Sequence, residues 1–253
     1  MADSFPAATA HGPIEEVFPE VFLVRGTMRY PHWKMVLARN MIIVRTGTEL
    51  TLFNSVRLDA AGELALEGLG TVTHLVKLGA FHGVDDPYYV DRYRPTLWAP
   101  PEATHKGELT TDRVLDEDGD SPVPGATLFR FACAALPEVA VRLPVAGGTL
   151  LTCDAVTNMI DHQGCEGVES QVTREHGFLR PASIGAMWRN AMTREHGPSL
   201  LLDYRRLLEQ IRFVNLISAH GPPLRDTAAT DLTATLQFIF GAKVTWQQPL
   251  GPG

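Results

Sequence analysis

The sequence predicts an α+β fold in which two mixed β-sheets pack face to face and helices cover the outside. Short apolar runs rich in strand-forming residues dominate 20–54 and 127–153, and each region contains a hairpin pattern. Segments with helical spacing alternate with the other strands instead of gathering at one end of the chain. Because a purely parallel wound sheet would not contain hairpins, a sheet sandwich flanked by helices is favoured.

The N-terminal part of the chain is expected to form a short tail and then a hairpin-rich sheet. Residues 1–13 are rich in Ala, Pro, His and Gly, so we expect a flexible tail. Gly47 separates the apolar runs 40–45 and 49–54, as at the turn of a hairpin. The spacing of the apolar residues then changes over 59–70, which predicts a short helix that ends at Gly70.

The rest of the chain supplies further strands and the outer helices. Residues 72–78 predict a strand and 96–99 another, with a helix that has Pro87 in its first turn between them. The acidic stretch 102–122 predicts a surface loop, and 155–200 is a mixture of helix and loop. The remaining predicted elements are strands at 127–133, 138–143 and 149–153, a helix at 201–210, a strand at 213–218 and a helix at 226–239. We therefore expect one domain over 14–241 and a C-terminal tail over 242–253.

Composition restricts the classes of function. The chain has 253 residues, of which 45% are hydrophobic and 20% charged, and a net charge of −7. This length supports one large core, and the absence of a basic stripe argues against nucleic acid and against a membrane surface as partners. Three cysteines without zinc-finger spacing fit a reducing compartment. We expect a soluble cytoplasmic protein that acts on a small molecule, with its oligomeric state left open.

Three apolar runs lead into residues that can bind a metal ion. The run from Val72 leads to His82 and then to Asp85 and Asp86, the run from Gly148 leads to Asp154, and the run from Phe213 leads to His220. If these runs are neighbouring strands of one sheet, their C-terminal ends meet at one edge. Imidazole and carboxylate ligands together suit a divalent cation. The sequence therefore predicts that positions 82, 154 and 220 share one cavity.

The order of elements resembles the metallo-β-lactamase fold, the αββα hydrolase superfamily, over roughly residues 14–240. Asn40-Met-Ile-Ile-Val is similar to the first hairpin of that fold, and Glu49-Leu-Thr-Leu-Phe-Asn-Ser to the strand after it. Thr73 to Asp86 takes the place of the His-x-His-x-Asp-His loop, Leu150-Leu-Thr-Cys-Asp154 that of the strand with the bridging Asp, and Leu216-Ile-Ser-Ala-His220 that of the closing strand. The resemblance implies a four-layer αββα sandwich in a divergent branch with a reduced metal-binding loop.

The departures from the family pattern limit the metal site. If His82 takes the second His position of the loop, Ala80 stands at the first; if His82 takes the first, Val84 falls at the second and Asp86 at the Asp. The Gly-His pair expected later in the chain is replaced by Leu-Pro-Glu138-Val, so Glu138 either binds the metal, supports a ligand, or the ligand is lost. The resemblance thus implies at most one cation, Zn, Mn or Fe, with ligands from His82, Asp85 or Asp86, Asp154, His220 and Glu138.

The expected chemistry is hydrolysis of an ester, lactone, amide or phosphoester bond. A cation with an open coordination position acidifies bound water, Asp154 binds the metal or orients that water, and Asp85 or Asp86 acts as general base. Two alternatives stay open. The first is a relative that has lost metal binding and serves as a binding module, and the second is a metal-free enzyme that uses Asp/His acid–base chemistry.

Overall fold

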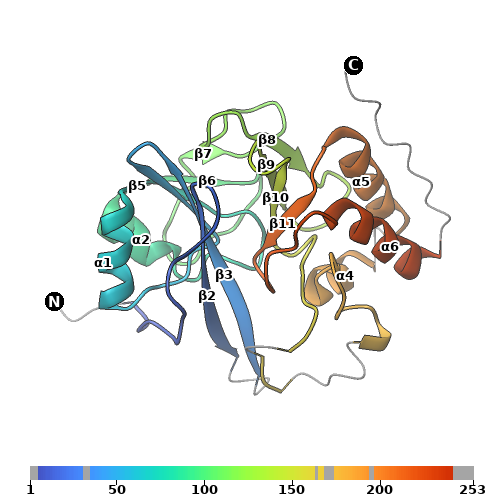
Figure 1. Ribbon diagram of the computed structural model, residues 1–253, viewed down its shortest axis with the longest axis horizontal. Coiled ribbons are helices and arrows are strands. Elements are labelled where there is room, and N and C mark those ends of the chain that lie inside the picture. The colour runs from blue at the N-terminus through green and yellow to red at the C-terminus, as the bar shows by residue number, and fades with distance from the viewer. Residues whose placement is uncertain (1–4, 31–34, 163–164, 168–173, 194–196, 242–253) are drawn as a thin grey trace.

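The computed structural model describes residues 5–30, 35–162, 165–167, 174–193 and 197–241. It contains two β-sheets with helices outside both, as the αββα prediction requires (Figure 1). In the order in which they pair, the strands of the seven-stranded sheet are β1 (Glu15–Phe18), β2 (Val21–Tyr30), β3 (Met35–Thr46), β4 (Glu49–Phe53), β5 (Thr71–Val76), β6 (Thr96–Ala99) and β7 (Arg113–Val114). The strands of the second sheet are β11 (Asn215–Ser218), β10 (Thr149–Thr152), β9 (Val139–Leu143) and β8 (Thr127–Arg130).

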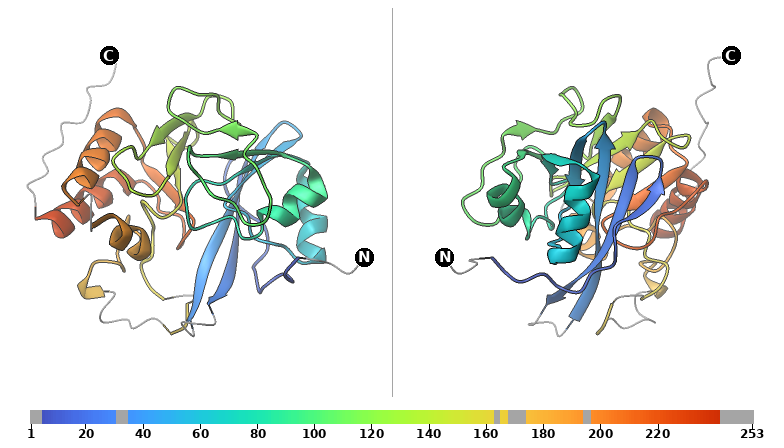
Figure 2. Two further views of the ribbon diagram at one scale, coloured as in Figure 1. Left: turned by 180° about the vertical axis from the view of Figure 1, so that it is seen from behind. Right: turned by 60° about the vertical axis from the view of Figure 1, so that its left-hand side comes forward.

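Helices lie on the outer faces of both sheets (Figure 2). On one side are α1 (Ala60–Leu69) and α2 (Asp86–Tyr93), and on the other are α4 (Ala186–Thr193), α5 (Gly197–Gln210) and α6 (Ala228–Phe240). Helix α1 begins where predicted, because the Asp59 side chain accepts a hydrogen bond from the backbone N–H of Gly62 (2.8 Å). No helix among the described residues is long and apolar enough to cross a membrane.

Three clusters of buried apolar side chains match the layers of the sandwich. One lies between the two sheets and includes Phe53, Val76, Leu151 and Ile217. The other two lie under the helices on either side. The alternation of inward-facing residues along β3, β4, β9 and β10 supplies these layers, so the helical and strand periods read from the sequence already specify the architecture.

The structure corrects two predictions about arrangement. Residues 5–13 pack on the domain, since His11 forms a bridge with Gly26 and the Thr9 hydroxyl donates to the Thr27 carbonyl (2.6 Å). The strands that lead to the candidate ligands also do not share one sheet. Strands β10 and β11 are parallel neighbours in the small sheet, whereas β5 belongs to the large one. The predicted tail at 242–253 lies outside the described residues.

Candidate metal centre

Three side chains, which we call the triad, converge where the two sheets meet. His82 follows β5, Asp154 follows β10 and His220 follows β11. The His82 Nε2 and His220 Nε2 atoms are 3.1 Å apart. Asp154 Oδ2 is 3.6 Å from His82 Nε2, and Asp154 Oδ1 is 3.4 Å from His220 Nε2. The predicted convergence of positions 82, 154 and 220 is therefore present, although the strands belong to different sheets.

The separations within the triad fit a single small cation. Imidazole nitrogens and carboxylate oxygens bind zinc at about 2.0–2.2 Å, so ligands of one ion stand roughly 3–3.5 Å apart. The three observed separations, 3.1, 3.4 and 3.6 Å, are close to this range. The side chains are 9%, 10% and 13% exposed for His82, Asp154 and His220. The burial and spacing of these side chains are therefore those of a candidate site for one divalent ion.

The backbone fixes the orientation of His220. Its Nδ1 lies 2.7 Å from the carbonyl oxygen of Ala38, which can only accept a hydrogen bond, so Nδ1 carries the proton. In the neutral ring Nε2 then presents a lone pair to Asp154 and His82, as in metal-binding histidines held by a carbonyl. The Asn40 amide donates to the carbonyls of Ser218 (2.8 Å) and Gly221 (2.7 Å) and so holds the turn on both sides of His220.

The pKa shifts of the triad reflect its burial and its close spacing. Burial lowers the pKa of His82 to about 3. Burial raises the pKa of Asp154, but hydrogen bonding to His220 and the charge of both imidazoles outweigh it and lower that pKa to about 2. Burial likewise lowers the pKa of His220, yet its interactions with Asp154 raise it overall. A carboxylate and two nitrogen lone pairs directed at one point repel unless a proton or a cation lies there.

Glu138 supports the triad from behind. It is wholly buried, and its carboxylate accepts hydrogen bonds from the backbone N–H groups of Cys153, Asp154 and Ala155, each at 2.9 Å. Burial and the charge of Asp154 raise its pKa to about 8, against the effect of the backbone donors. Of the roles that the sequence left open for Glu138, the geometry matches support of Asp154 and not metal binding.

The thiol of Cys153 lies beside the triad and is a further candidate metal ligand. Potential ligand atoms of His82, Cys153 and Asp154 lie within 4.8 Å of one another, and the Cys153 thiol donates to Asp154 Oδ2 (3.2 Å). Burial raises the pKa of the thiol well above its usual value, which favours the protonated form. The triad with His220 is therefore the tighter candidate set of ligands. Sequence analysis used the three cysteines only to infer a reducing compartment, and the place of Cys153 next to Asp154 was the available signal.

The predicted ligands Asp85 and Asp86 form contacts away from the triad. The Asp85 carboxylate pairs with the buried guanidinium of Arg39 (2.6 Å) and accepts the backbone N–H of Arg57 (2.9 Å). Asp86 accepts the hydroxyl of Ser55 (2.6 Å), and burial raises its pKa. Two hollows are lined by His82 and His220, one of about 230 Å³ and a crevice of about 10 Å³, and neither aspartate lines either of them. We assign neither to metal binding or to the reaction.

The loop before His82 is held by a lysine that sequence analysis did not consider. The Lys77 ammonium, at the end of β5, donates to the carbonyls of Ala80 (3.3 Å) and His82. Neither register predicted for the His-x-His-x-Asp-His pattern supplies a further ligand next to His82. A third register, with His82 at the last position, puts Lys77 and Gly79 at the two earlier His positions and Phe81 at the Asp.

Gly79 has no room for a ligand side chain. A Cβ atom there would lie 2.9 Å from Cys153 Cβ, 3.0 Å from its Sγ and 3.1 Å from Glu138 Oε2. These separations are below ordinary van der Waals contact. One side of the site is therefore filled by Cys153, Glu138 and the Lys77 ammonium.

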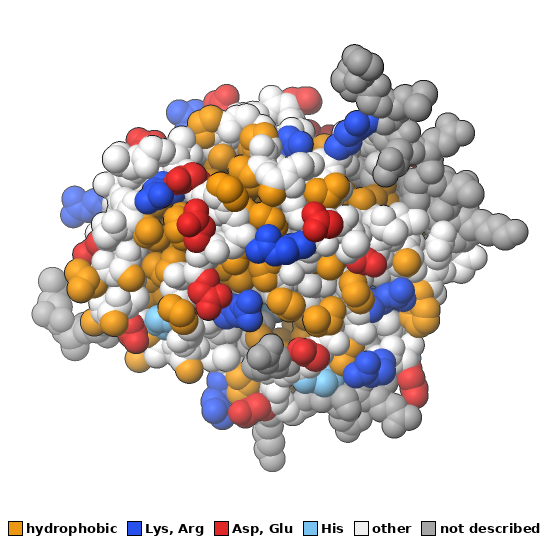
Figure 3. Space-filling model, in the orientation of Figure 1, with side chains coloured by type: hydrophobic (Ala, Val, Ile, Leu, Met, Phe, Trp, Pro, Cys, Tyr) orange, Lys and Arg blue, Asp and Glu red, His pale blue; other side chains and the backbone are white. Residues whose placement is uncertain are grey.

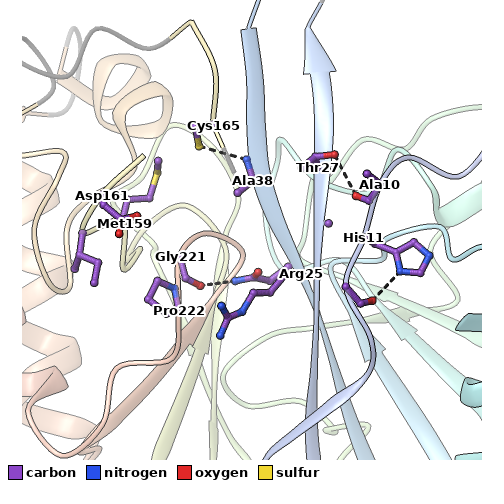
Figure 4. A pocket seen from close by; sticks show the side chains of 14 residues that line it. Ala10, His11, Arg25, Thr27, Ala38, Met159, Asp161, Cys165, Gly221 and Pro222 are labelled. Atoms are coloured by element: carbon purple, nitrogen blue, oxygen red, sulfur yellow. Dashed lines mark hydrogen bonds between the residues drawn. The ribbon is translucent and has the colours of Figure 1, made fainter. Parts of the chain in front are cut away.

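Two cavities of similar size lie near the C-terminal ends of these strands. The first, which we call the triad cavity, has a volume of about 230 Å³ and is lined by all three triad residues. The second, of about 300 Å³, lies between the N-terminal segment, β2 and β3, and the segment that carries Met159 and Cys165 (Figure 4). None of the triad lines this second cavity. The chemistry is therefore assigned to the triad cavity.

Comparison with known proteins defines the fold. No protein-family model matches the sequence, and no curated protein shows significant sequence similarity to it. Solved structures do match. DIM-1 metallo-β-lactamase exposed to ceftazidime is 12% identical, with 93% of this chain and 99% of that chain covered and a TM-score of 0.57. The mono-zinc form of the metallo-β-lactamase FIM-1 from Pseudomonas aeruginosa is 14% identical, with 92% and 97% covered and a TM-score of 0.54.

A flavo di-iron protein mutant from Thermotoga maritima is also similar. It is 15% identical, the match covers 90% of this chain and 62% of that one, and the TM-score is 0.61. The chain therefore has the metallo-β-lactamase fold, as the resemblance implied. At this identity the likeness establishes the fold, and activity has to be argued from the triad.

Proposed function

We propose that this protein is a metal-dependent hydrolase with a single divalent cation bound by His82, Asp154 and His220. The observation that carries the proposal is the triad itself, whose ligand atoms lie 3.1–3.6 Å apart in a nearly buried position. Two imidazoles and one carboxylate form a donor set that proteins use for catalytic zinc and for non-haem Fe(II). Zinc and iron are also named for structures of similar fold. The proposed cation is Zn or Fe, with Mn as a third choice.

The cation and the residues have separate parts in the proposed reaction. When bound, a divalent ion supplies a Lewis acid that polarises the scissile bond and acidifies water. Asp154 is the one carboxylate among the described residues that line the triad cavity, so it is the group placed to orient an attacking water and accept its proton. The Ala38 carbonyl keeps His220 in the tautomer that leaves Nε2 free. Glu138 keeps the Asp154 backbone in position.

The proposed reaction is addition of water across an ester, lactone, amide or phosphoester bond. The hydroxyl of water joins the acyl carbon or the phosphorus, the bond to the leaving oxygen or nitrogen breaks, and the second proton of water goes to the leaving group. The reaction therefore needs neither oxidant nor reductant. A small-molecule substrate agrees with the volume of the triad cavity, about 230 Å³.

Metal content tests the proposal directly. Protein purified without added metal should contain close to one equivalent of Zn, Fe or Mn by elemental analysis, and Asp154→Asn or His220→Ala should lose it. Asp91→Asn and His176→Ala are matched controls, because both side chains are exposed and neither lines the triad cavity; they should keep the metal. A metal-free wild type that cannot be loaded by added Zn²⁺, Fe²⁺ or Mn²⁺ would refute the proposal.

A second function is favoured by one observation. The Lys77 ammonium donates to the His82 carbonyl, and the packing around Gly79 leaves no room for a ligand side chain there, which supports the loss of part of a larger ligand set. If the loss extends to the whole site, the protein is a binding module. In that case chelator would leave its melting temperature unchanged, whereas a resident metal should stabilise the folded state.

A further inference from the structure

Polar side chains are a minority in the lining of the triad cavity. They are His82, Asp154 and His220, which lie together, and Thr157. The rest of the lining is hydrocarbon, thioether or aromatic, and six of these residues carry the argument: Met35, Leu37, Phe81, Met159, Ile184 and Met187. They come from β3, the His82 loop, the segment after β10, the residues before α4 and the start of α4 itself. A cavity with mostly apolar walls and one group of reactive side chains selects a ligand that has an apolar part and one polar, reactive group.

No lysine or arginine is among the described residues that line the triad cavity. Arg39 borders a neighbouring crevice of about 10 Å³ next to His82, but its guanidinium already pairs with Asp85 at 2.6 Å. A substrate carboxylate or phosphate held away from the triad would thus lose its hydration without a cationic side chain to pair with, which is costly. The face seen in Figure 3 shows acidic and basic side chains interspersed, without a broad basic field that would draw in anions.

We propose that the substrate carries a neutral, apolar alkyl or aryl group that fills the triad cavity, with the scissile ester or amide carbonyl at the triad. The proposal deepens the proposed function and rests on it for the bond that is cleaved. The apolar selectivity rests on the lining alone. Binding in such a cavity gains from each methylene that leaves water, about fourfold in affinity per buried CH₂. The volume, about 230 Å³, is slightly below the usual range for small-molecule sites, about 300–1,000 Å³, so a medium-length chain or a single ring fits best.

Methionine methyl groups provide a readout that does not depend on catalysis. Met35, Met159 and Met187 line the cavity, whereas Met41 is buried in another apolar cluster. Protein labelled with ¹³C at the methionine methyl groups is titrated with octanamide, a neutral probe, in the presence of chelator. We expect the signals of the three cavity methionines to shift and that of Met41 to stay. Substitution of each cavity methionine by Leu assigns the signals.

Chain length and charge are then varied in the same assay. Octanamide should bind at least about tenfold more tightly than butanamide, because even partial burial of the extra methylenes adds up. Octanoate, which has the same chain but a negative charge, should bind at least about tenfold more weakly than octanamide. Leu37→Asp, on the cavity wall, should abolish the shifts, whereas Leu64→Asp, at a side chain that is 72% exposed on α1, should leave them unchanged.

The results separate this inference from the proposed function. Unshifted cavity methionines, equal binding of octanoate and octanamide, or equal effects of Leu37→Asp and Leu64→Asp would overturn the inference, with metal binding unaffected. Octanamide binding by a protein that added Zn²⁺, Fe²⁺ or Mn²⁺ cannot load would instead keep the apolar pocket and refute the hydrolase. If Leu37→Asp does not fold, as judged from the Met41 signal, Met187→Glu replaces it, since that side chain is 39% exposed and tolerates a charge in the folded state.

Discussion

Replacement of Glu138 by Gln tests the support of the triad most sharply. The two carboxylate oxygens accept three backbone N–H groups through four contacts of 2.9 Å. Gln has the same shape but only one acceptor oxygen, so its NH₂ group must face at least one of these N–H donors. Leaving a buried donor unsatisfied costs about 1–3 kcal/mol. We expect Glu138→Gln to lower the free energy of unfolding by about 2 kcal/mol, with a fall of roughly 4–8 °C in melting temperature.

Urea denaturation of the metal-free protein measures this free energy, and Glu108→Gln is the control. Glu108 is an exposed glutamate in the loop before β7, so its change should stay within about 0.5 kcal/mol. Titration with Zn²⁺ gives a second readout. Because the donors belong to Cys153, Asp154 and Ala155, the variant should also bind metal about 10–100-fold more weakly, as for other residues that orient a ligand. Wild-type stability together with wild-type affinity would refute the role assigned to Glu138.

Three further predictions follow from the packing around the site. Gly79→Ala should lower the free energy of unfolding, measured by urea denaturation, by about 1–3 kcal/mol because its Cβ would overlap Cys153. Gly68→Ala, in open space on α1, should raise it by about 0.5–1 kcal/mol. Equal effects of the two substitutions would contradict the close approach at position 79. Asp85→Asn should cost about 3–5 kcal/mol by leaving the buried Arg39 charge unpaired, and Arg39→Met with Asp85→Leu should recover most of that loss; a double variant as unstable as the single one would count against the ion pair. Lys77→Met should lower Zn²⁺ affinity at least about tenfold in a calorimetric titration, because the carbonyls of the His82 loop lose their donor, and an unchanged affinity would show that the loop holds itself.

Local sequence signals were enough to predict much of the fold. Helix α1 is defined by Asp59 and Gly70 at its two ends, and the hairpin of β3 and β4 turns at Gly47, where φ is +63°. These features depend on residues a few positions apart, so periodicity and turn chemistry reveal them. The assignment of β5 and β10 to different sheets depends on long-range pairing, which no local pattern encodes.

The residues of the candidate site likewise divide into those that local sequence signals predict and those that depend on long-range contacts. Asp154 and His220 could be predicted because a polar residue that follows an apolar strand lies at the edge of a sheet. The prediction that Asp85 or Asp86 is a ligand or a base rested only on their proximity to His82 in the sequence. Asp85 instead pairs with Arg39 on β3, and nothing near position 85 indicates that partner. Lys77 was overlooked for a related reason: a lysine at the end of a strand is ordinarily exposed, and its burial becomes visible only in the folded chain.

In the proposed function, space and charge limit the site to one cation. His82, Asp154 and Cys153 offer three candidate ligand atoms and His220 a fourth, but the space beside them is already occupied. The Lys77 ammonium, donating to the His82 carbonyl, brings a fixed positive charge into the loop, and a second divalent ion nearby would be repelled at low dielectric. A ligand at position 79 would meet Cys153 and Glu138. To create a second site, three positions would have to change together: 77 to remove the charge, 79 to supply a ligand and 153 to make room for it.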